Sequence, residues 1–490
     1  MKEKIKKIIC DKNLYIFSAI VLIFLGMLNK IEFAVDSYAT FTFSMKEFIN
    51  QFTSSGRFVL IVAGGILKIL NLKPETTYMV SFITALACMI ISIYKLYTML
   101  EKDIKSSGIR KIIPILVILN AFSIEMFLFI EKGIMVFAIM MCIFAVGEIK
   151  KWLEEKKNKY LITTLIFMLL ANFSYQGTVG IFIALAVVYI IKYSKDIKEF
   201  IINNVVVALS YGIPAIIDYV LIKVICKSSR VSGSIILSES LKKVCSNTLG
   251  MMKDTYGILP KYFLLSLIVI IVVIIIYQII IKKSDTKTKL VNGLKVIYII
   301  AGTIVGAVAP QLMQNTDSIW FVARSTYSYA ALYGVLVLYL FMNYDVKTYV
   351  KYIVLAMSMV LLVVQFNRFN LIETDRYKVN EMDYEITRNV IEKIDNYEKE
   401  TGNEITKIGI YADKSLEFTY SGIFATGDTN IKAYFKDWSI VAIIKYYTGR
   451  RLTIVETNPD IEKKFEENDW KRFNDSQLIF DGDTLYLCRY

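Results

Sequence analysis

Long apolar runs recur through most of this sequence, and they restrict its possible folds more than any other feature. The first extends from Leu14 to Ile31, and the others lie at about 76–98, 112–130, 133–149, 160–173, 177–193, 203–225, 261–281, 292–314, 326–343 and 351–366. Many of them approach the roughly 20 residues with which an α-helix crosses a bilayer. Because 55% of the 490 residues are hydrophobic, the sequence predicts a polytopic α-helical membrane protein with about eleven transmembrane helices.

The first apolar run is expected to remain in the mature protein. It follows the lysine-rich segment MKEKIKK and shows no small-residue cleavage site, so it is interpreted as a retained helix and not as a signal peptide. Lysines also gather in the short connections between runs and contribute to the net charge of +13. This placement is typical of loops that face an anionic leaflet, so the charge indicates a lipid bilayer as partner and not nucleic acid.

One short segment, 58–72, decides the predicted topology. It contains Gly64, Gly65 and Lys68. If it does not cross the membrane, the basic connections all lie on the side of the N-terminus, whereas a crossing turns all of them outward. At roughly 1 kcal/mol for each basic residue near an anionic surface, the first arrangement is favoured. We therefore expect a re-entrant or interfacial helix on the outer side, with a short tilted crossing helix as the alternative.

With the N-terminus inside, the outward elements can be predicted. They are 32–75 with its juxtamembrane helices, 131–133, 172–177, 226–260, 315–324 and the C-terminal segment. Residues 1–366 are thus expected to form the transmembrane module, and 367–490 a small extracytoplasmic α/β domain. In that domain we expect helices at 381–399 and 438–447, strands at 405–411 and 452–456, and a hairpin at 477–489.

The residue types restrict the chemistry. Histidine is absent, which excludes an imidazole base and the usual histidine metal sites. None of the six cysteines forms a CxxC pair. Cys226 and Cys245 flank a predicted outward loop, so a disulfide between them is an open alternative. The richness in Lys, Ile and Asn suggests a bacterium of low genomic GC content.

An outward carboxylate and two outward arginines are the main candidates for catalysis. Asp36 follows the first run and can take a proton from a hydroxyl group. Arg57 and Arg324 are the best cations for a phosphate, because a guanidinium binds it through paired donors. Each has a simpler interpretation: Asp36 as a helix cap, Arg57 as a snorkelling side chain and Arg324 as an interfacial anchor. Asp317 is either a partner of Arg324 or merely solvated.

Further polar residues lie at predicted outward turns. Tyr175 and Gln176 stand between two runs and can bind sugar hydroxyls, although a plain polar turn is the alternative. Glu131 and Lys132 occupy a tight hairpin and, with Glu125, can form a second charged cluster. In addition, Asp218 lies within an apolar run, where an ionisable group is a functional candidate. Lys223 is close enough in sequence to neutralise it.

The order of these features resembles the O-antigen serotype-converting glucosyltransferase family of GT-C enzymes. The resemblance rests on Asp36, on Gly56-Arg57 at the start of an apolar segment, on the Tyr175-Gln176 turn and on Arg324. The tail adds Trp470-Lys-Arg-Phe, then Leu478-Ile-Phe-Asp-Gly-Asp and Leu485-Tyr-Leu. The motifs are short, but together they cover most of the chain.

This resemblance implies a GT-C-like fold and an inverting transfer of a hexose, glucose by the family's chemistry. The donor is a polyprenyl-phosphate-linked sugar, and the acceptor is a cell-surface polysaccharide outside the cytoplasmic membrane. Asp36 is then the base, and Gly56 and Arg57 match the family's Gly-Arg element. Where the family often has paired acidic residues this chain has Asp36-Ser37, so a metal-free mechanism without a cofactor is favoured over one with a divalent metal.

Two other functions stay open at this point. A transporter or flippase for lipid-linked sugars would also need a charged groove between helices, but neither a two-fold repeat nor paired helix interruptions are found. A glycan polymerase or ligase would use diphosphate-linked donors.

Overall fold

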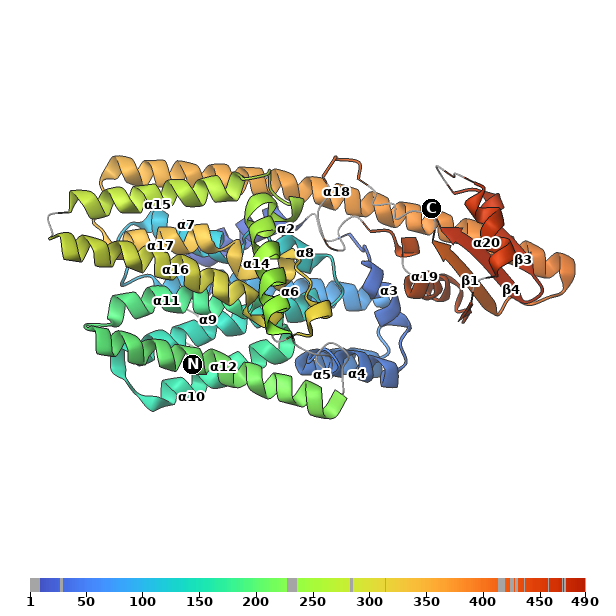
Figure 1. The fold of residues 1–490 in the computed structure, drawn as a ribbon, viewed down its shortest axis with the longest axis horizontal. Coiled ribbons are helices and arrows are strands. Elements are labelled where there is room, and N and C mark those ends of the chain that lie inside the picture. Colours follow the sequence, from blue (N-terminus) through green and yellow to red (C-terminus); the bar gives the residue numbers. More distant parts are fainter. Residues whose placement is uncertain are drawn as a thin grey trace. The chain divides into compact units, whose positions relative to one another are not determined.

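The chain divides into two compact units, each described here by itself (Figure 1). The computed structural model describes residues 9–26, 30–226, 236–282, 285–312, 314–412, 419–423, 427, 431–435, 437–456, 458–468, 470 and 473–489. Unit 1 comprises Met1–Asn29, Ile49–Phe127 and Glu131–Asn370, and unit 2 comprises Lys30–Phe48, Leu128–Ile130 and Leu371–Tyr490. The N-terminal lysine cluster, part of the stretch 226–260 and Lys471-Arg472 lie outside the described residues.

Unit 1 is built almost entirely from helices, and the long apolar ones run side by side (Figure 1). The helices of unit 1 are α2 (Lys12–Leu25), α5 (Phe58–Ile69), α6 (Pro74–Met99), α7 (Ser107–Ile118), α8 (Ser123–Phe127), α9 (Lys132–Glu155), α10 (Asn158–Ser174), α11 (Gly180–Tyr193), α12 (Ile197–Leu221), α14 (Leu237–Asp254), α15 (Phe263–Ile281), α16 (Thr286–Leu312), α17 (Leu332–Asn343) and the first part of α18 (Thr348–Thr401). α4 (Met45–Thr53) contains residues of both units.

Seven of the described helices are long and apolar enough to cross a membrane. They are Pro74–Met99, Lys132–Glu155, Gln176–Tyr193, Ile197–Val224, Phe263–Ile281, Thr286–Leu312 and Thr348–Thr401. Three further apolar helices, Lys12–Leu25, Phe58–Ile69 and Leu332–Asn343, are shorter. The structure thus supports a helical membrane protein, whereas the predicted number of about eleven spans is not confirmed.

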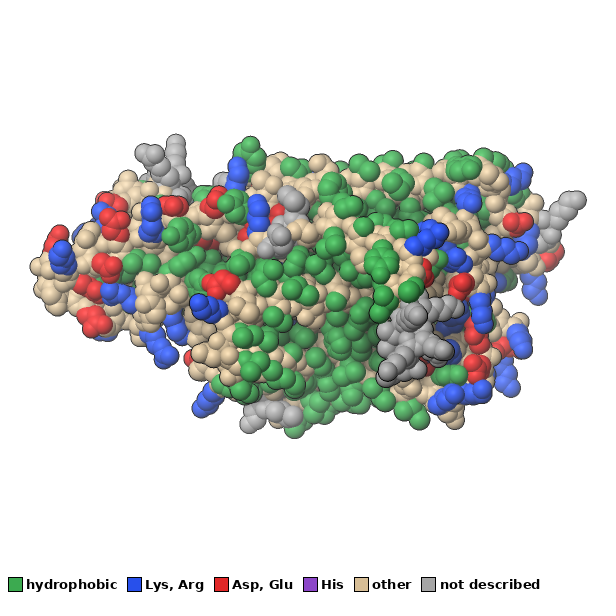
Figure 2. Space-filling view, turned by 180° about the vertical axis from the view of Figure 1, so that it is seen from behind, with side chains coloured by type: hydrophobic (Ala, Val, Ile, Leu, Met, Phe, Trp, Pro, Cys, Tyr) green, Lys and Arg blue, Asp and Glu red, His purple; other side chains and the backbone are tan. Residues whose placement is uncertain are grey.

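The apolar surface of unit 1 fits a lipid environment. Val269, Val273 and Ile276 share one face of α15 and are 52%, 58% and 43% exposed. Hydrophobic side chains cover the middle of unit 1 in Figure 2, and Lys and Arg side chains gather at one end of its helices. Soluble monomers rarely expose continuous apolar surface of this kind.

α5 is a special case because it covers the segment on which the predicted topology depends. It has 12 residues, which at 1.5 Å per residue cover about 18 Å. The hydrocarbon core of a bilayer is roughly 30 Å thick. α5 alone is therefore too short for a full crossing.

The basic connections meet at one end of unit 1. Asp103, after α6, accepts hydrogen bonds from Lys150 near the end of α9, at 2.7 Å, and from Lys192 at the end of α11. Lys156, after α9, donates to Asn203 near the start of α12 at 2.7 Å. Several connections that were predicted to share one side of the membrane therefore share one end of the helices.

Unit 2 contains a small sheet with the strand order β2-β1-β4-β3. Its strands are β1 (Lys407–Ala412), β2 (Thr453–Val455), β3 (Leu478–Asp481) and β4 (Thr484–Arg489). β1 is parallel to β2 and to β4, and β3 and β4 form an antiparallel hairpin. The predicted hairpin turn lies at Gly482, whose φ of 58° suits glycine.

Helices pack against this sheet. α19 (Asp437–Thr448), α20 (Pro459–Glu466) and the second part of α18 belong to unit 2. Tyr411 and Cys488 of the sheet form a buried core with Ile461 and Phe465 of α20. The small C-terminal sheet that the sequence predicts is thus present.

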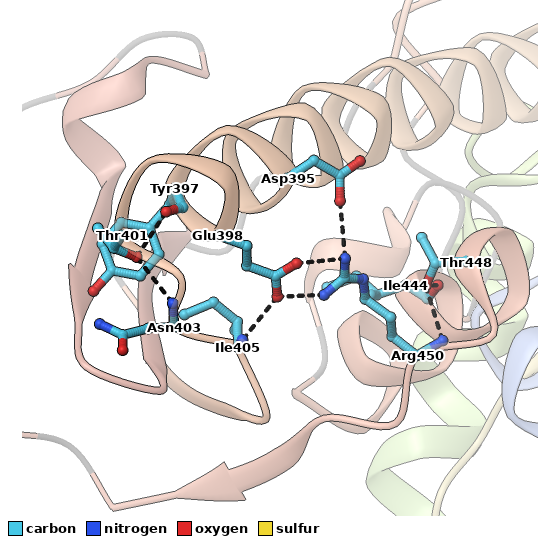
Figure 3. A network of polar contacts seen from close by, with 9 residues as sticks. All are labelled: Asp395, Tyr397, Glu398, Thr401, Asn403, Ile405, Ile444, Thr448 and Arg450. Atoms are coloured by element: carbon cyan, nitrogen blue, oxygen red, sulfur yellow. Dashed lines mark hydrogen bonds and ion pairs between the residues drawn. The ribbon is translucent and has the colours of Figure 1, made fainter.

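Arg450 fastens the end of α18 to the rest of unit 2 (Figure 3). It donates to both carboxylate oxygens of Glu398, at 2.5 and 2.8 Å, and to Asp395 at 2.9 Å. Glu398 also accepts the backbone N–H of Ile405 at 2.8 Å. Such paired guanidinium–carboxylate bonds are among the stronger side-chain interactions, and here they join α18 to the segment between α19 and β2.

We predict that Asp103→Asn destabilises unit 1. The Asp103 side chain is only 3% exposed and binds two lysines, so the change leaves two partly buried ammonium groups without their carboxylate. Removing one partner of a buried ion pair costs about 3 to 5 kcal/mol. The thermal unfolding midpoint of the detergent-purified protein should fall by several degrees. Lys151→Met, at a lysine that is 44% exposed and pairs with Glu148, is the control and should leave the midpoint nearly unchanged.

Candidate functional site

Polar and charged side chains of unit 1 come together at the end of the helices opposite to the basic connections. We call this group the polar cluster. Its members are Arg57, Glu125, Glu131, Lys132, Tyr175, Gln176, Asp218 and Arg324. α9 shows the separation of the two ends, because it begins at Lys132 in the polar cluster and carries Lys150 near its other end.

Arg57 and Glu131 form the first ion pair of the polar cluster. Arg57 immediately precedes α5 and follows Gly56, whose φ of 72° disfavours other residues. Its Nη1 donates to Glu131 Oε1 at 2.9 Å, and the two side chains are 18% and 6% exposed. The guanidinium carbon also lies 5.1 Å from the ring centroid of Tyr175, within the range of a cation–π contact.

Arg324 and Glu125 form the second ion pair, which is more deeply buried. The Arg324 backbone N–H donates to Glu125 Oε2 at 2.7 Å, and its Nη1 donates to Glu125 Oε1. The side chains are 7% and 0% exposed. Asp317, the neighbour considered in the sequence analysis, is exposed in a separate 3-10 helix, Thr316–Ser318. Arg324 therefore pairs with a carboxylate that lies 199 residues away in sequence.

Tyr175 is held between these two ion pairs. It is extended, with a φ of −161°, between α10 and the 3-10 helix Gln176–Thr178, and its side chain is buried. Burial raises the pKa of its phenol, although the Arg324 and Arg57 guanidinium groups act in the opposite direction. The phenol is therefore neutral near pH 7 and is suited to hydrogen bonding rather than to proton abstraction.

Gln176 connects three separate parts of the chain. Its Nε2 donates to the Ser55 carbonyl at 3.1 Å and to Asp218 Oδ2 at 2.8 Å. The next residue, Gly177, also lies close to Arg324, because a Cβ on it would approach the Arg324 carbonyl oxygen to 2.7 Å. The Tyr-Gln turn is therefore an integral part of the polar cluster.

Lys132 is fully buried where α9 packs on α6. Its Nζ lies 3.5 Å from the ring centroid of Tyr78 and 5.8 Å from that of Phe82. The following residue, Gly133, donates its backbone N–H to Ser81 Oγ at 2.9 Å. Lys132 therefore belongs to the polar cluster through its neighbour Glu131 in sequence, while its side chain lies among aromatic rings.

The structure thus brings together most of the residues that the sequence analysis named as candidates: Arg57, Glu125, Glu131, Lys132, Tyr175, Gln176, Asp218 and Arg324. The pairings of Arg324 with Glu125 and of Gln176 with Asp218 were not predicted. The sequence indicated these pairings only indirectly, because Glu125 and Asp218 are ionisable residues inside apolar runs. Among the residues that the structure describes, no three His, Cys, Asp or Glu side chains form a group that could hold a metal ion.

Asp36 belongs to unit 2 and is described there. It is exposed on α3 (Val35–Thr42), and the N-cap of this helix is Ala34. Asp36 is therefore the second residue of the helix and not its N-cap. A negative side chain in the first turn interacts favourably with the helix dipole.

Cys245 is a free, exposed thiol on α14, and the side chain of Cys226 lies outside the described residues.

Side chains of α18 hold the start of the Asp36 helix. Phe33 donates its backbone N–H to Asn380 Oδ1 at 2.8 Å, and its carbonyl accepts a hydrogen bond from Arg376 Nη2. Arg376 is 1% exposed, and its Nη1 also donates to the Ile431 carbonyl at 3.1 Å. Both backbone groups of Phe33 are thus bound to one turn of α18.

α19 holds the remainder of the Asp36 helix. Lys445 donates to the Thr42 carbonyl at 2.5 Å, and Ser439 donates to the Val35 carbonyl at 3.3 Å. The Tyr38 and Tyr446 rings also meet edge to face, with centroids 5.7 Å apart. The segment that carries Asp36 is therefore a structural part of the C-terminal unit.

We predict that Gly56→Ala disturbs the polar cluster. A Cβ at this position would lie 2.5 Å from Ile222 Cδ1, 2.6 Å from Gln176 Nε2 and 2.7 Å from Asp218 Oδ1. The left-handed backbone alone costs about 1 to 2 kcal/mol for alanine. The thermal midpoint should therefore fall clearly. Gly65→Ala is the matched control, because nothing lies within 4 Å of its added Cβ, and it should leave the midpoint equal or higher.

We also predict that Asn380→Ala loosens the start of the Asp36 helix. The alanine removes the acceptor for the Phe33 N–H, whereas Asn380→Asp retains an oxygen at this position. Hydrogen exchange of peptides that cover residues 33–42 should accelerate in Asn380→Ala and stay near the wild-type rate in Asn380→Asp. Unchanged exchange in both variants would show that the Asn380 hydrogen bond does not hold this helix.

Comparison with known proteins does not supply a relative. No family model, curated protein or solved structure matches this chain. Its function is therefore argued from the residues and the geometry described above.

Proposed function

We propose that this chain is an integral membrane glycosyltransferase that uses a polyprenyl-phosphate-linked sugar. It moves a hexose, glucose by the resemblance, to a cell-surface polysaccharide at the outer side of a bacterial cytoplasmic membrane. One observation carries the proposal: Gly56-Arg57, Tyr175-Gln176 and Arg324 meet in the polar cluster. These are three of the motifs on which the resemblance rests, and they come from distant parts of the chain.

The proposed topology follows from the separation of charge between the two ends of unit 1. Lys150, Lys156 and Lys192 lie at one end, and the anionic cytoplasmic leaflet favours basic residues. The polar cluster then lies at the outer side, together with the donor phosphate. Unit 2 is outside in this arrangement, with the N-terminus inside.

In the proposed reaction Asp36 accepts the proton of an acceptor hydroxyl group. The hydroxyl oxygen attacks the anomeric carbon of the donor, and the bond between this carbon and the phosphate oxygen breaks. The electron pair of that bond leaves with the polyprenyl phosphate, and the configuration at the anomeric carbon is inverted. A cation near the departing phosphate oxygen stabilises the charge that develops there.

The two arginines differ in how they can serve as that cation. Arg57 forms one hydrogen bond to Glu131 and keeps 18% of its side chain exposed. Arg324 is held by Glu125 through both its backbone and its side chain. We assign direct phosphate binding to Arg57, while Arg324 contributes positive charge from a fixed position. The ring of Tyr175 lies 5.1 Å from the Arg57 guanidinium carbon.

The decisive experiment is transfer by purified protein in liposomes from a radiolabelled hexosyl polyprenyl phosphate to surface polysaccharide. We expect Asp36→Asn to lower the rate by roughly 10² to 10⁴-fold, the usual contribution of a general base. Asp460→Asn, which changes an exposed carboxylate of α20, should leave the rate unchanged.

Other outcomes would point to other functions. Full activity of Asp36→Asn would remove Asp36 from the mechanism. Transfer from diphosphate-linked donors alone would indicate a polymerase or ligase. Movement of the lipid-linked sugar across the bilayer without transfer would indicate a transporter or flippase.

A further inference from the structure

Asp218 is a buried carboxylate in an apolar helix that the proposed reaction does not yet use. It lies near the C-terminal end of α12 and is 3% exposed. Lys223, the cation nearest in sequence, is exposed, and its Nζ lies 5.8 Å from the Tyr219 ring. Among the described residues the hydrogen-bond partner of Asp218 is the neutral amide of Gln176. Proximity in sequence therefore does not explain why this carboxylate is present.

The two oxygens of Asp218 have different surroundings. Oδ2 accepts from Gln176 Nε2 at 2.8 Å, and the same nitrogen is tied to the Ser55 carbonyl at 3.1 Å. Oδ1 is buried and has no hydrogen-bond partner among the described residues. A Cβ on Gly56 would lie 2.7 Å from Oδ1, so glycine at this position keeps a side chain away from it. Gln176 thus fixes the carboxylate while one oxygen keeps its capacity to accept hydrogen bonds.

The charge of this site indicates which kind of ligand it suits. Glu125 and Glu131 each bind a guanidinium group, whereas Asp218 is bound only by an amide. Because its partner is an amide, Asp218 offers a phosphate no opposite charge at this position. A neutral group that donates hydrogen bonds would instead satisfy Oδ1, and an unsatisfied buried acceptor is costly. Hydroxyl groups have this chemistry, and a sugar ring carries several of them.

We propose that Asp218 and Gln176 form the subsite that binds the hydroxyl groups of the donor hexose and thereby selects the sugar. This inference rests on the proposed function and extends it, because it separates recognition of the sugar from binding of the phosphate by Arg57. The Gln176 side chain joins the two, since it contacts the carbonyl of Ser55 two residues before Arg57. A site built to bind a hydroxyl group strongly rejects an analogue that lacks it, because its buried polar atoms are then left unpaired.

The test uses polyprenyl phosphates that carry glucose or one of its single-deoxy analogues, with full-length protein in liposomes. For the wild type we expect kcat/KM to fall by about 10²-fold or more for at least one analogue. Asp218→Ala should lower kcat/KM for the complete sugar while leaving that analogue nearly unaffected, so that the discrimination falls to about threefold or less. Asp218→Asn retains an acceptor oxygen and should keep part of the discrimination. Lys223→Ala is the matched control and should behave as the wild type.

Three results would overturn this inference. The first is an equal loss on every donor in Asp218→Ala and in Asp218→Asn, with the discrimination unchanged, because this indicates a structural role. The second is a wild type that transfers every analogue as well as the complete sugar. The third is a wild-type protein that transfers sugar from none of the donors. This result overturns the proposed function itself, and it can be seen with the wild type alone.

Discussion

Pairing of buried charges is the constraint on which the rest of unit 1 depends. Its helices are covered by apolar side chains, and a charge between them is costly unless an opposite charge lies next to it. At one end Asp103 binds Lys150 and Lys192. At the other end Arg57 binds Glu131, and Arg324 binds Glu125. Each pair joins segments distant in sequence, so the same contacts that neutralise the charges also fix which connections meet. The ion pairs of the polar cluster therefore connect distant segments of unit 1 and also bring its charged side chains close together.

The C-terminal domain is larger than the sequence analysis predicted, because unit 2 also contains a segment from the N-terminal part of the chain. From the sequence it was predicted to be a small extracytoplasmic α/β domain of residues 367–490. In the structure it includes the segment 30–48, and Arg376 and Asn380 bind both backbone groups of Phe33 just before the Asp36 helix. Under the proposed function, the domain therefore carries the catalytic base, while unit 1 carries the cations for the departing phosphate.

The sequence could predict the elements of this protein but few of its pairings. The apolar runs predicted long helices such as α6 and α9, because a helix that crosses a membrane needs a nearly continuous apolar stretch of about 20 residues. The small sheet was also predictable, since strand composition and the Asp-Gly-Asp turn are local features. Partners were not predictable, because they depend on topology: Phe33 binds Asn380 across 347 residues. Sequence proximity suggested Lys223 as partner of Asp218, whereas the structure pairs Asp218 with Gln176.

Under the proposed function, the distribution of charge in the polar cluster also explains how one site can bind the phosphate and the sugar of the donor differently. Arg57 and Arg324 are each bound to a glutamate. Under the proposed function, Glu131 holds Arg57 in place through one hydrogen bond, while the partly exposed guanidinium group binds the phosphate. Asp218 has no guanidinium partner of this kind among the described residues, and its unused oxygen favours neutral hydroxyl donors. Under the proposed function, selectivity for the sugar comes from hydrogen bonding at Asp218, and stabilisation of the transition state comes from charge at Arg57.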